Sequence, residues 1–212
     1  MKTNDLINAI AADAKAPGMP IATTVWIGAG IGVVVTGLLF WLMLPVRPDM
    51  QAALGDWHFL MKWVFSLTLL LTGLVLAISL ARPQWAPNST LLLLLGAPIV
   101  LGIGVVADMI ALPSDAWMPT MVGTAPFACL FYVPLLSGLP LALMLLALRQ
   151  GAPAHPALAG AVAGIIATGI AATFYATHCQ NDSPLFLAAW YIMATLIVAS
   201  VGALLGARLL RW

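Results

Sequence analysis

The chain has 212 residues, of which 63% are apolar and only 7% are charged, and its formal net charge is +1. A soluble domain carries about 25% charged residues, so this composition excludes an ordinary soluble protein and indicates an integral membrane protein. The near-neutral charge and the lack of a basic patch predict no direct contact with nucleic acid, which needs Lys and Arg clustered against phosphate.

The first predicted element is a short amphipathic helix over residues 3–15. Thr3 can cap this helix by accepting a backbone N–H, and Asp5 favours the positive end of the helix dipole. The apolar face consists of three side chains at helical spacing: Leu6, Ile7 and Ile10. A helix of about a dozen residues is marginal alone in water, so this face needs a cover. The cover is either the membrane surface or the rest of the protein, or a groove on a soluble partner.

Six long apolar runs follow the N-terminal segment, and each can cross a bilayer, which takes about 20 helical residues. Hydrocarbon offers the backbone no hydrogen-bond partner, so each run has to be helical there. The predicted spans are residues 22–44, 61–81, 88–111, 124–148, 156–177 and 185–207. The predicted fold class is therefore all-α. Residues 21–212 form a polytopic bundle of six transmembrane helices in the lipid bilayer, and residues 1–20 form a cytoplasmic N-terminal segment.

The distribution of Lys and Arg predicts the orientation. With six spans, both termini lie on the same side of the membrane. That side would hold six of these residues: Lys2, Lys15, Arg82, Arg149, Arg208 and Arg211. The opposite side would hold only Arg47 and Lys62. Because loops that stay in the cytoplasm carry an excess of Lys and Arg, we expect both termini to be cytoplasmic.

Small residues mark faces where helices can approach closely. Three pairs of glycines have the four-residue spacing that clears one side of a helix: Gly28/Gly32, Gly160/Gly164 and Gly202/Gly206. Packing within a single bundle is the favoured interpretation, and dimerisation through one of these faces is the alternative. In the fourth span, Pro134 and Pro140 each remove a backbone donor and predict a kink.

Counting residues places the two cysteines on one side of the membrane. Cys129 precedes Arg149 by 20 residues, a rise of about 30 Å in a helix, so it reaches the surface opposite the termini. Cys179 falls in the loop between the fifth and sixth spans, which lies on that same side. A disulfide there would be a structural bond, or the pair would act as a redox-responsive or metal-responsive sensor.

Four residues near this loop are competent ligands for a soft or borderline metal: Cys129, His178, Cys179 and Asp182. The adjacent His178 and Cys179 do not easily face one ion together, and the chain has no Cys-x-x-Cys motif. The spacing is therefore a weak signal for a metal centre. We expect no resident cofactor, with a transient heavy-metal ion as a candidate signal.

Other ionisable residues fall at the same membrane edge: Asp56, His58, Lys62 and Asp108. Charges at a bilayer edge usually anchor helices there, and anchoring is the favoured interpretation, with a part in signal sensing as the alternative. The middle of each span lacks the ionisable residues of proton relays and transport sites. The chain also lacks a nucleotide-binding loop, a Gly-x-Ser-x-Gly elbow and a His-Glu-x-x-His pair. We therefore nominate no catalytic residue and predict that the protein is not an enzyme.

Six short segments carry a family resemblance through their order along the chain: Met1–Ile7, Arg47–Asp49, Arg149–Pro153, His178–Phe186, Trp190–Tyr191 and Leu209–Trp212. The most specific part is the His-Cys-x-x-Asp-Ser-Pro stretch that begins at His178. Together these segments resemble the NrsF-type proteins, the negative regulators of sigma F. The resemblance runs from end to end and implies a six-helix anti-sigma factor in the bacterial inner membrane.

The resemblance also implies a partner and a signal. The partner is an extracytoplasmic-function sigma factor, held by the cytoplasmic N-terminal region that contains Thr3, Asp5 and the apolar face. The signal is heavy-metal or oxidative stress, sensed by two periplasm-facing cysteines that match Cys129 and Cys179.

Burying Leu6, Ile7 and Ile10 in such a partner contributes roughly 5–8 kcal/mol before ordering costs. This is too little for tight sequestration, so we expect further contacts from the loops at Arg82 and Arg149. Two other function classes stay open: a thiol-redox membrane enzyme that uses the two cysteines, and a small channel or transporter.

Overall fold

A computed structural model of the chain describes residues 3–13, 19–84 and 89–211, and of residues 10–13 it describes the backbone alone. The described residues form helices and no strand, which confirms the all-α fold class. In chain order the elements are α1 (Thr3–Asp13), α2 (Ile21–Met43), α3 (Met50–Ala53), α4 (Trp57–Leu80), the 3₁₀ segment η1 (Ser89–Leu95), α5 (Gly96–Ala111), α6 (Ser114–Val122), α7 (Pro126–Leu148), α8 (Pro156–Ala176), α9 (Pro184–Phe186), the π-helical segment η2 (Leu187–Tyr191) and α10 (Ile192–Leu209).

Six helical stretches are long and apolar enough to cross a membrane: α2, α4, η1–α5, α7, α8 and α9–η2–α10. They confirm the six predicted spans. The largest difference is at the start of the second span, which begins at Trp57 and not at residue 61. Asp56 causes the earlier start, because its carboxylate caps α4 by accepting a hydrogen bond from the backbone N–H of His58 at 3.0 Å.

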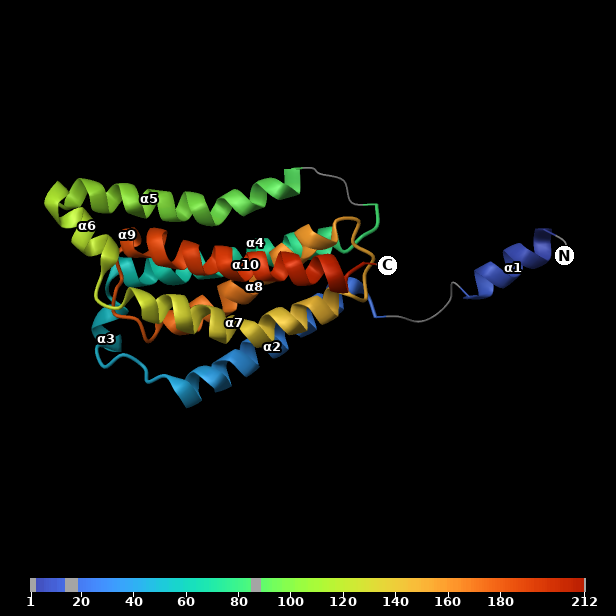
Figure 1. Ribbon diagram of the computed structural model, residues 1–212, viewed down its shortest axis with the longest axis horizontal. Coiled ribbons are helices and arrows are strands. Elements are labelled where there is room, and N and C mark those ends of the chain that lie inside the picture. Colours follow the sequence, from blue (N-terminus) through green and yellow to red (C-terminus); the bar gives the residue numbers. More distant parts are fainter. Residues whose placement is uncertain (1–2, 14–18, 85–88, 212) are drawn as a thin grey trace.

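The spans lie side by side along the long axis of the molecule, with α5 at one edge and α2 at the other (Figure 1). Helix α2 begins and α10 ends at the same end, which we call the terminal end. At the other end, the opposite end, lie α3, α6, α9 and the loop of residues 177–183. Helix α1 lies apart from the bundle, beyond the terminal end (Figure 1).

Helix α8 is the central helix of the bundle. It packs against α10, α4, α7 and α2, and 67% of its most apolar stretch is buried, against 17% for η1–α5 at the edge. Its abundance of Ala and Gly, which makes it the least apolar span in the sequence, lets four neighbouring helices approach its backbone.

The glycine pairs pack helices against each other within this bundle. A Cβ atom built on Gly164 of α8 would lie 2.6 Å from the carbonyl oxygen of Val198 in α10. One built on Gly206 of α10 would lie 2.6 Å from the carbonyl oxygen of Pro156. Gly28 of α2 faces Ala147 of α7, with 3.3 Å between the two Cβ positions. These contacts confirm the favoured interpretation of the glycine spacing.

Replacing Gly164 by Ala is expected to lower the free energy of unfolding by about 1–3 kcal/mol, because α8 and α10 would have to separate. Gly30 of α2 is the matched control, since a Cβ there meets no heavy atom within 4 Å. Gly30→Ala should stabilise the helix by about 0.5–1 kcal/mol. Thermal unfolding of both variants in detergent checks this, and equal shifts would contradict the packing account.

The predicted kink in the fourth span concerns α7, which contains Pro134 and Pro140. The helix runs as one element from Pro126 to Leu148 through both prolines. Pro140 is buried and faces α2, where a Cβ on Gly32 would lie 3.5 Å from the proline Cβ. The proline ring therefore fills the space that the glycine leaves at this helix crossing.

Candidate functional site

The first candidate site is α1 at the terminal end. Leu6 and Ile7 are 45% and 56% exposed, and Thr3 and Asp5 are exposed as well. The side chain of Ile10 lies outside the described residues. An isolated helix of this length is marginal in water. The bundle leaves the apolar side chains of Leu6 and Ile7 uncovered, so α1 presents a surface that another molecule can bury.

The second candidate site is the cysteine pair at the opposite end. Cys129 lies in the first turns of α7 and is fully buried, and Cys179 follows α8 and is 6% exposed. Both thiols are free and belong to one cluster of buried apolar side chains, which also contains Tyr175, Phe186 and Tyr191. The structure therefore places the two cysteines, which are 50 residues apart in the sequence, in one buried cluster.

The other two predicted metal ligands are occupied elsewhere. Asp182 pairs with Arg47 and Lys62, at 2.8 and 2.7 Å. The Nδ1 atom of His178 lies 2.7 Å from the carbonyl oxygen of Pro45. Among the residues that the structure describes, no three His, Cys, Asp or Glu side chains are grouped to hold a metal ion. The four-ligand centre of Cys129, His178, Cys179 and Asp182 is therefore not formed.

Four charged side chains form an ion-pair network beside Cys179, in which Asp49 is exposed and the other three are largely buried: Arg47, Asp49, Lys62 and Asp182. Lys62 is fully buried and Arg47 is 7% exposed. The Nε and Nη2 atoms of Arg47 donate to Asp49 at 2.8 and 2.7 Å, and Nη1 donates to Asp182 at 2.8 Å. Two positive and two negative charges cancel, so the network carries no net charge into the apolar end of the bundle.

The hydrogen bonds from Arg47 hold the pKa of Asp49 at about 2, below its usual range. The same bonds raise the pKa of Arg47, although burial alone would lower it. A carboxylate with a depressed pKa loses its contribution only as the pH falls through that value. The Arg47–Asp49 pair therefore persists throughout the physiological range of pH.

The ion-pair network holds the backbone on both sides of Cys179. All three N–H bonds of the Lys62 ammonium are used: they go to the carbonyl oxygen of Cys179 at 2.8 Å, to that of Asn181 at 3.2 Å and to Asp182. Arg47 Nη1 also reaches the Cys179 carbonyl at 3.4 Å, and the Arg47 backbone N–H donates to the Thr177 carbonyl at 3.0 Å. A displacement of Cys179 therefore acts directly on α4 and on the chain that follows α2.

A second chain of polar contacts holds the end of the same loop. The ring of His58 bridges two carboxylates, with Nδ1 2.9 Å from Asp56 and Nε2 3.0 Å from Asp108 of α5. The hydroxyl of Ser183 donates to the other oxygen of Asp108. Burial alone would raise the pKa of Asp56, but its hydrogen bonds with His58 lower it.

These contacts correct the sequence interpretation of the opposite edge. Lys62 is completely buried and Asp108 is only 2% exposed, so neither side chain anchors its helix at the bilayer surface. Both bind the loop of residues 177–183 instead. The sequence could have indicated this pairing through its charges. Counting residues along the spans places two cations and two carboxylates at the same membrane edge, and charges in apolar surroundings are paired. These residues are Arg47, Lys62, Asp108 and Asp182.

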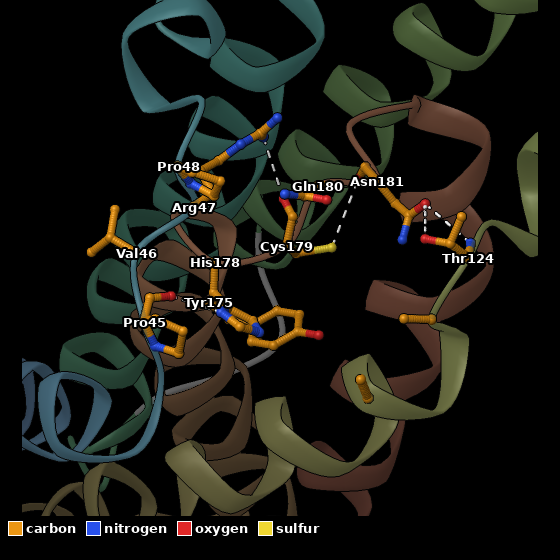
Figure 2. Close-up of a pocket in the computed structure, with 12 residues that line it drawn as sticks. Pro45, Val46, Arg47, Pro48, Thr124, Tyr175, His178, Cys179, Gln180 and Asn181 are labelled. Atoms are coloured by element: carbon orange, nitrogen blue, oxygen red, sulfur yellow. Dashed lines mark hydrogen bonds between the residues drawn. The ribbon is translucent and has the colours of Figure 1, made fainter.

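A cavity of about 320 Å³ lies beside Cys179 at the opposite end. Figure 2 shows it between the segment of Pro45 to Pro48 and Thr124, with Tyr175 and His178 between them. The backbone N–H and hydroxyl of Thr124 both donate to the side-chain oxygen of Asn181 at 3.2 Å, which joins the start of α7 to the Cys179 loop. A small solute in this cavity would contact Cys179, which is one of its lining residues.

Comparison with known proteins supports one of the function classes that the sequence left open. A family model described as the negative regulator of sigma F matches residues 10–212. The chain belongs to the NrsF family. The anti-sigma-F factor NrsF of Caulobacter vibrioides is 36% identical to it over 223 aligned positions, and the probable anti-sigma-F factor NrsF of Azospira oryzae is 33% identical over 219.

Both NrsF relatives match over their full length and over the full length of this chain. The match therefore includes all of α1, of which residues 3–9 lie before the region matched by the family model. The predicted family resemblance is confirmed. No solved structure matches the chain.

Proposed function

We propose that this NrsF-family protein is a membrane-bound anti-sigma factor that sequesters an extracytoplasmic-function sigma factor through α1. One observation carries the proposal: an amphipathic helix lies apart from a six-span bundle, with Leu6 and Ile7 exposed, in a chain of a family that restrains a sigma factor. The protein acts as a regulator and not as an enzyme, because the family is one of regulators.

The sigma factor offers a groove to the apolar face of α1, in the helix-in-groove mode of recognition. Leu6, Ile7 and Ile10 enter the groove, and Asp5 in the first turn favours the positive end of the helix that Thr3 begins. The three apolar side chains contribute roughly 5–8 kcal/mol before the helix and its partner are ordered. The exposed Arg82 at the terminal end of the bundle adds a contact of opposite charge to an acidic surface.

A pull-down of the detergent-solubilised protein from its host, with and without residues 1–18, tests this role. A sigma factor bound by the full chain and lost on truncation is the expected result. Retention after truncation would move the contact to the loops of the bundle. A thiol-redox turnover with no sigma factor bound by either form would contradict the proposal.

The signal enters at Cys129 and Cys179. A soft divalent metal ion bound by both thiolates releases two protons. Alternatively, hydrogen peroxide oxidises the two thiols to a disulfide and is itself reduced to two waters. Either reaction pulls Cys179 toward Cys129, against the bonds that Lys62 and Arg47 make to its carbonyl oxygen. Arg47 follows α2, and α2 leads back to the segment that bears α1, so these bonds link the thiols to the sigma-binding helix.

Replacing either Cys129 or Cys179 by Ser is expected to abolish induction of the sigma-dependent genes by cadmium salts and peroxide. Repression without stress should persist, because serine fills nearly the same space and α1 is untouched. A reporter gene driven by the sigma factor measures both quantities. Full induction in both serine variants would rule out the cysteine sensor and leave the cysteines a packing role.

The localisation that fits this mechanism is the bacterial inner membrane, with both termini in the cytoplasm. Support comes from the four exposed arginines at the terminal end, Arg82, Arg149, Arg208 and Arg211, whereas Arg47 and Lys62 at the opposite end are buried in ion pairs. A C-terminal green fluorescent protein fusion should fluoresce, and the matching alkaline phosphatase fusion should be inactive. The reverse pattern would refute this orientation.

A further inference from the structure

An apolar groove between α7 and α10 at the terminal end has no part in the proposed function. Its volume is about 290 Å³. The residues that matter for its shape are Gly138, Leu141, Leu145 and Arg149 at α7, and Leu205 and Leu209 of α10. A Cβ built on Gly138 meets no heavy atom within 4 Å, so the groove is open at its inner end.

The length of the groove matches one leaflet of a bilayer. Arg149 follows the last residue of α7, and Gly138 lies 11 residues earlier, which corresponds to about 16 Å along the helix. Half of the hydrocarbon core is about 15 Å thick. A groove of about 290 Å³ that extends over this length is much narrower than a helix with its side chains, which is about 10–12 Å across. The groove therefore fits one extended chain and excludes a helix such as α1.

The charge at the mouth of the groove selects the kind of chain. Arg149 is exposed and forms no ion pair with any residue that the structure describes. The segments that carry the lining residues at the mouth, residues 149–155 and 201–209, contain Arg149 and Arg208 and no Asp or Glu. A guanidinium at this depth lies at the level of lipid headgroups and binds a phosphate through two parallel hydrogen bonds.

We propose that this groove binds an anionic phospholipid, with one acyl chain along α7 and α10 and the phosphate on Arg149. Helices α7 and α10 each form one side of the groove, and the guanidinium of Arg149 lies where the acyl chain would meet the headgroup. Arg149 therefore acts toward lipid and not toward the soluble partner that the sequence suggested for it. Because the groove lies between α7 and α10, bound lipid fixes the spacing of these two helices at the terminal end.

Native mass spectrometry of the delipidated protein, titrated with phosphatidylglycerol and with phosphatidylcholine, tests the site. The wild type should retain one phosphatidylglycerol molecule in preference to phosphatidylcholine. Arg149→Gln should weaken phosphatidylglycerol binding about fivefold and remove the preference. Gly138→Leu, which fills the groove, should weaken binding of both lipids at least tenfold.

Two control variants separate the site from the rest of the lipid-facing surface. Gly102→Leu adds the same side chain in α5, where a Cβ also meets nothing within 4 Å. Arg211→Gln removes an arginine at the same end that does not line the groove. Both should bind lipid as the wild type does. The proposal is overturned by wild-type affinity in Gly138→Leu, by an unchanged preference in Arg149→Gln, or by a dimer that Gly138→Leu disrupts.

Discussion

The double variant Leu6→Asp, Ile7→Asp is expected to weaken binding of the sigma factor by at least about a hundredfold. Each of these side chains is about half exposed in the free protein, so burying the rest of each contributes about half of the 1.5–3 kcal/mol of full burial. Losing both amounts to about 1.5–3 kcal/mol, and placing two carboxylates in an apolar groove costs at least about 2 kcal/mol more. The measurement is a binding titration of the detergent-solubilised protein with the purified sigma factor.

The matched control is Asn8→Asp, Ala12→Asp. It adds the same two charges to α1, but at positions one turn apart on the side of the helix opposite Leu6 and Ile7, at about 3.6 residues per turn. The control should bind within about threefold of the wild type, because these positions lie outside the predicted contact. Equal losses in the two double variants would mean that charge alone weakens the complex and that the apolar face is not the contact.

Replacing Lys62 by Met is expected to lower the free energy of unfolding by about 3–5 kcal/mol. Lys62 is fully buried, and its removal leaves Asp182 without one of its two cations. It also takes the ammonium donor from the Asn181 carbonyl and leaves the Cys179 carbonyl with only the longer contact to Arg47. Denaturation in detergent, followed by circular dichroism, measures this change. A loss below about 1 kcal/mol would show that the ion-pair network does not hold the Cys179 loop.

The double variant Lys62→Met, Asp182→Asn separates the missing charge from the missing side chain. It leaves the Arg47–Asp49 pair with balanced charges and keeps an acceptor near Arg47. It should therefore recover a large part of the stability lost in Lys62→Met, by the reasoning of a double-mutant cycle. Strictly additive losses would instead mean that Lys62 and Asp182 act independently.

The membrane architecture could be predicted from the sequence because it rests on long apolar runs. The spans end within a few residues of the expected positions, since Pro126, Pro156 and Pro184 can begin a helix and polar loops cannot lie in hydrocarbon. Helix α1 was predictable for a similar reason, because its pattern and its boundary are local. The division into segments 1–20 and 21–212 stays a prediction.

The ion-pair network could not be predicted in the same way, because its members come from separate parts of the chain. Arg47 follows α2, Lys62 lies in α4, and Asp182 precedes α9. Their membrane depth can be counted, but their pairing depends on how the helices surround α8. The same limit explains the metal prediction: the sequence places Asp182 near Cys179, but only the fold shows that two cations already occupy its carboxylate.

The most direct test of the account is the affinity of the reconstituted protein for its sigma factor before and after treatment of the thiols with a cadmium salt or hydrogen peroxide. We expect treatment to lower the affinity at least tenfold in the wild type and to leave it unchanged in the Cys129→Ser, Cys179→Ser double variant. An affinity that stays the same in the treated wild type would contradict the link between the opposite end of the bundle and α1.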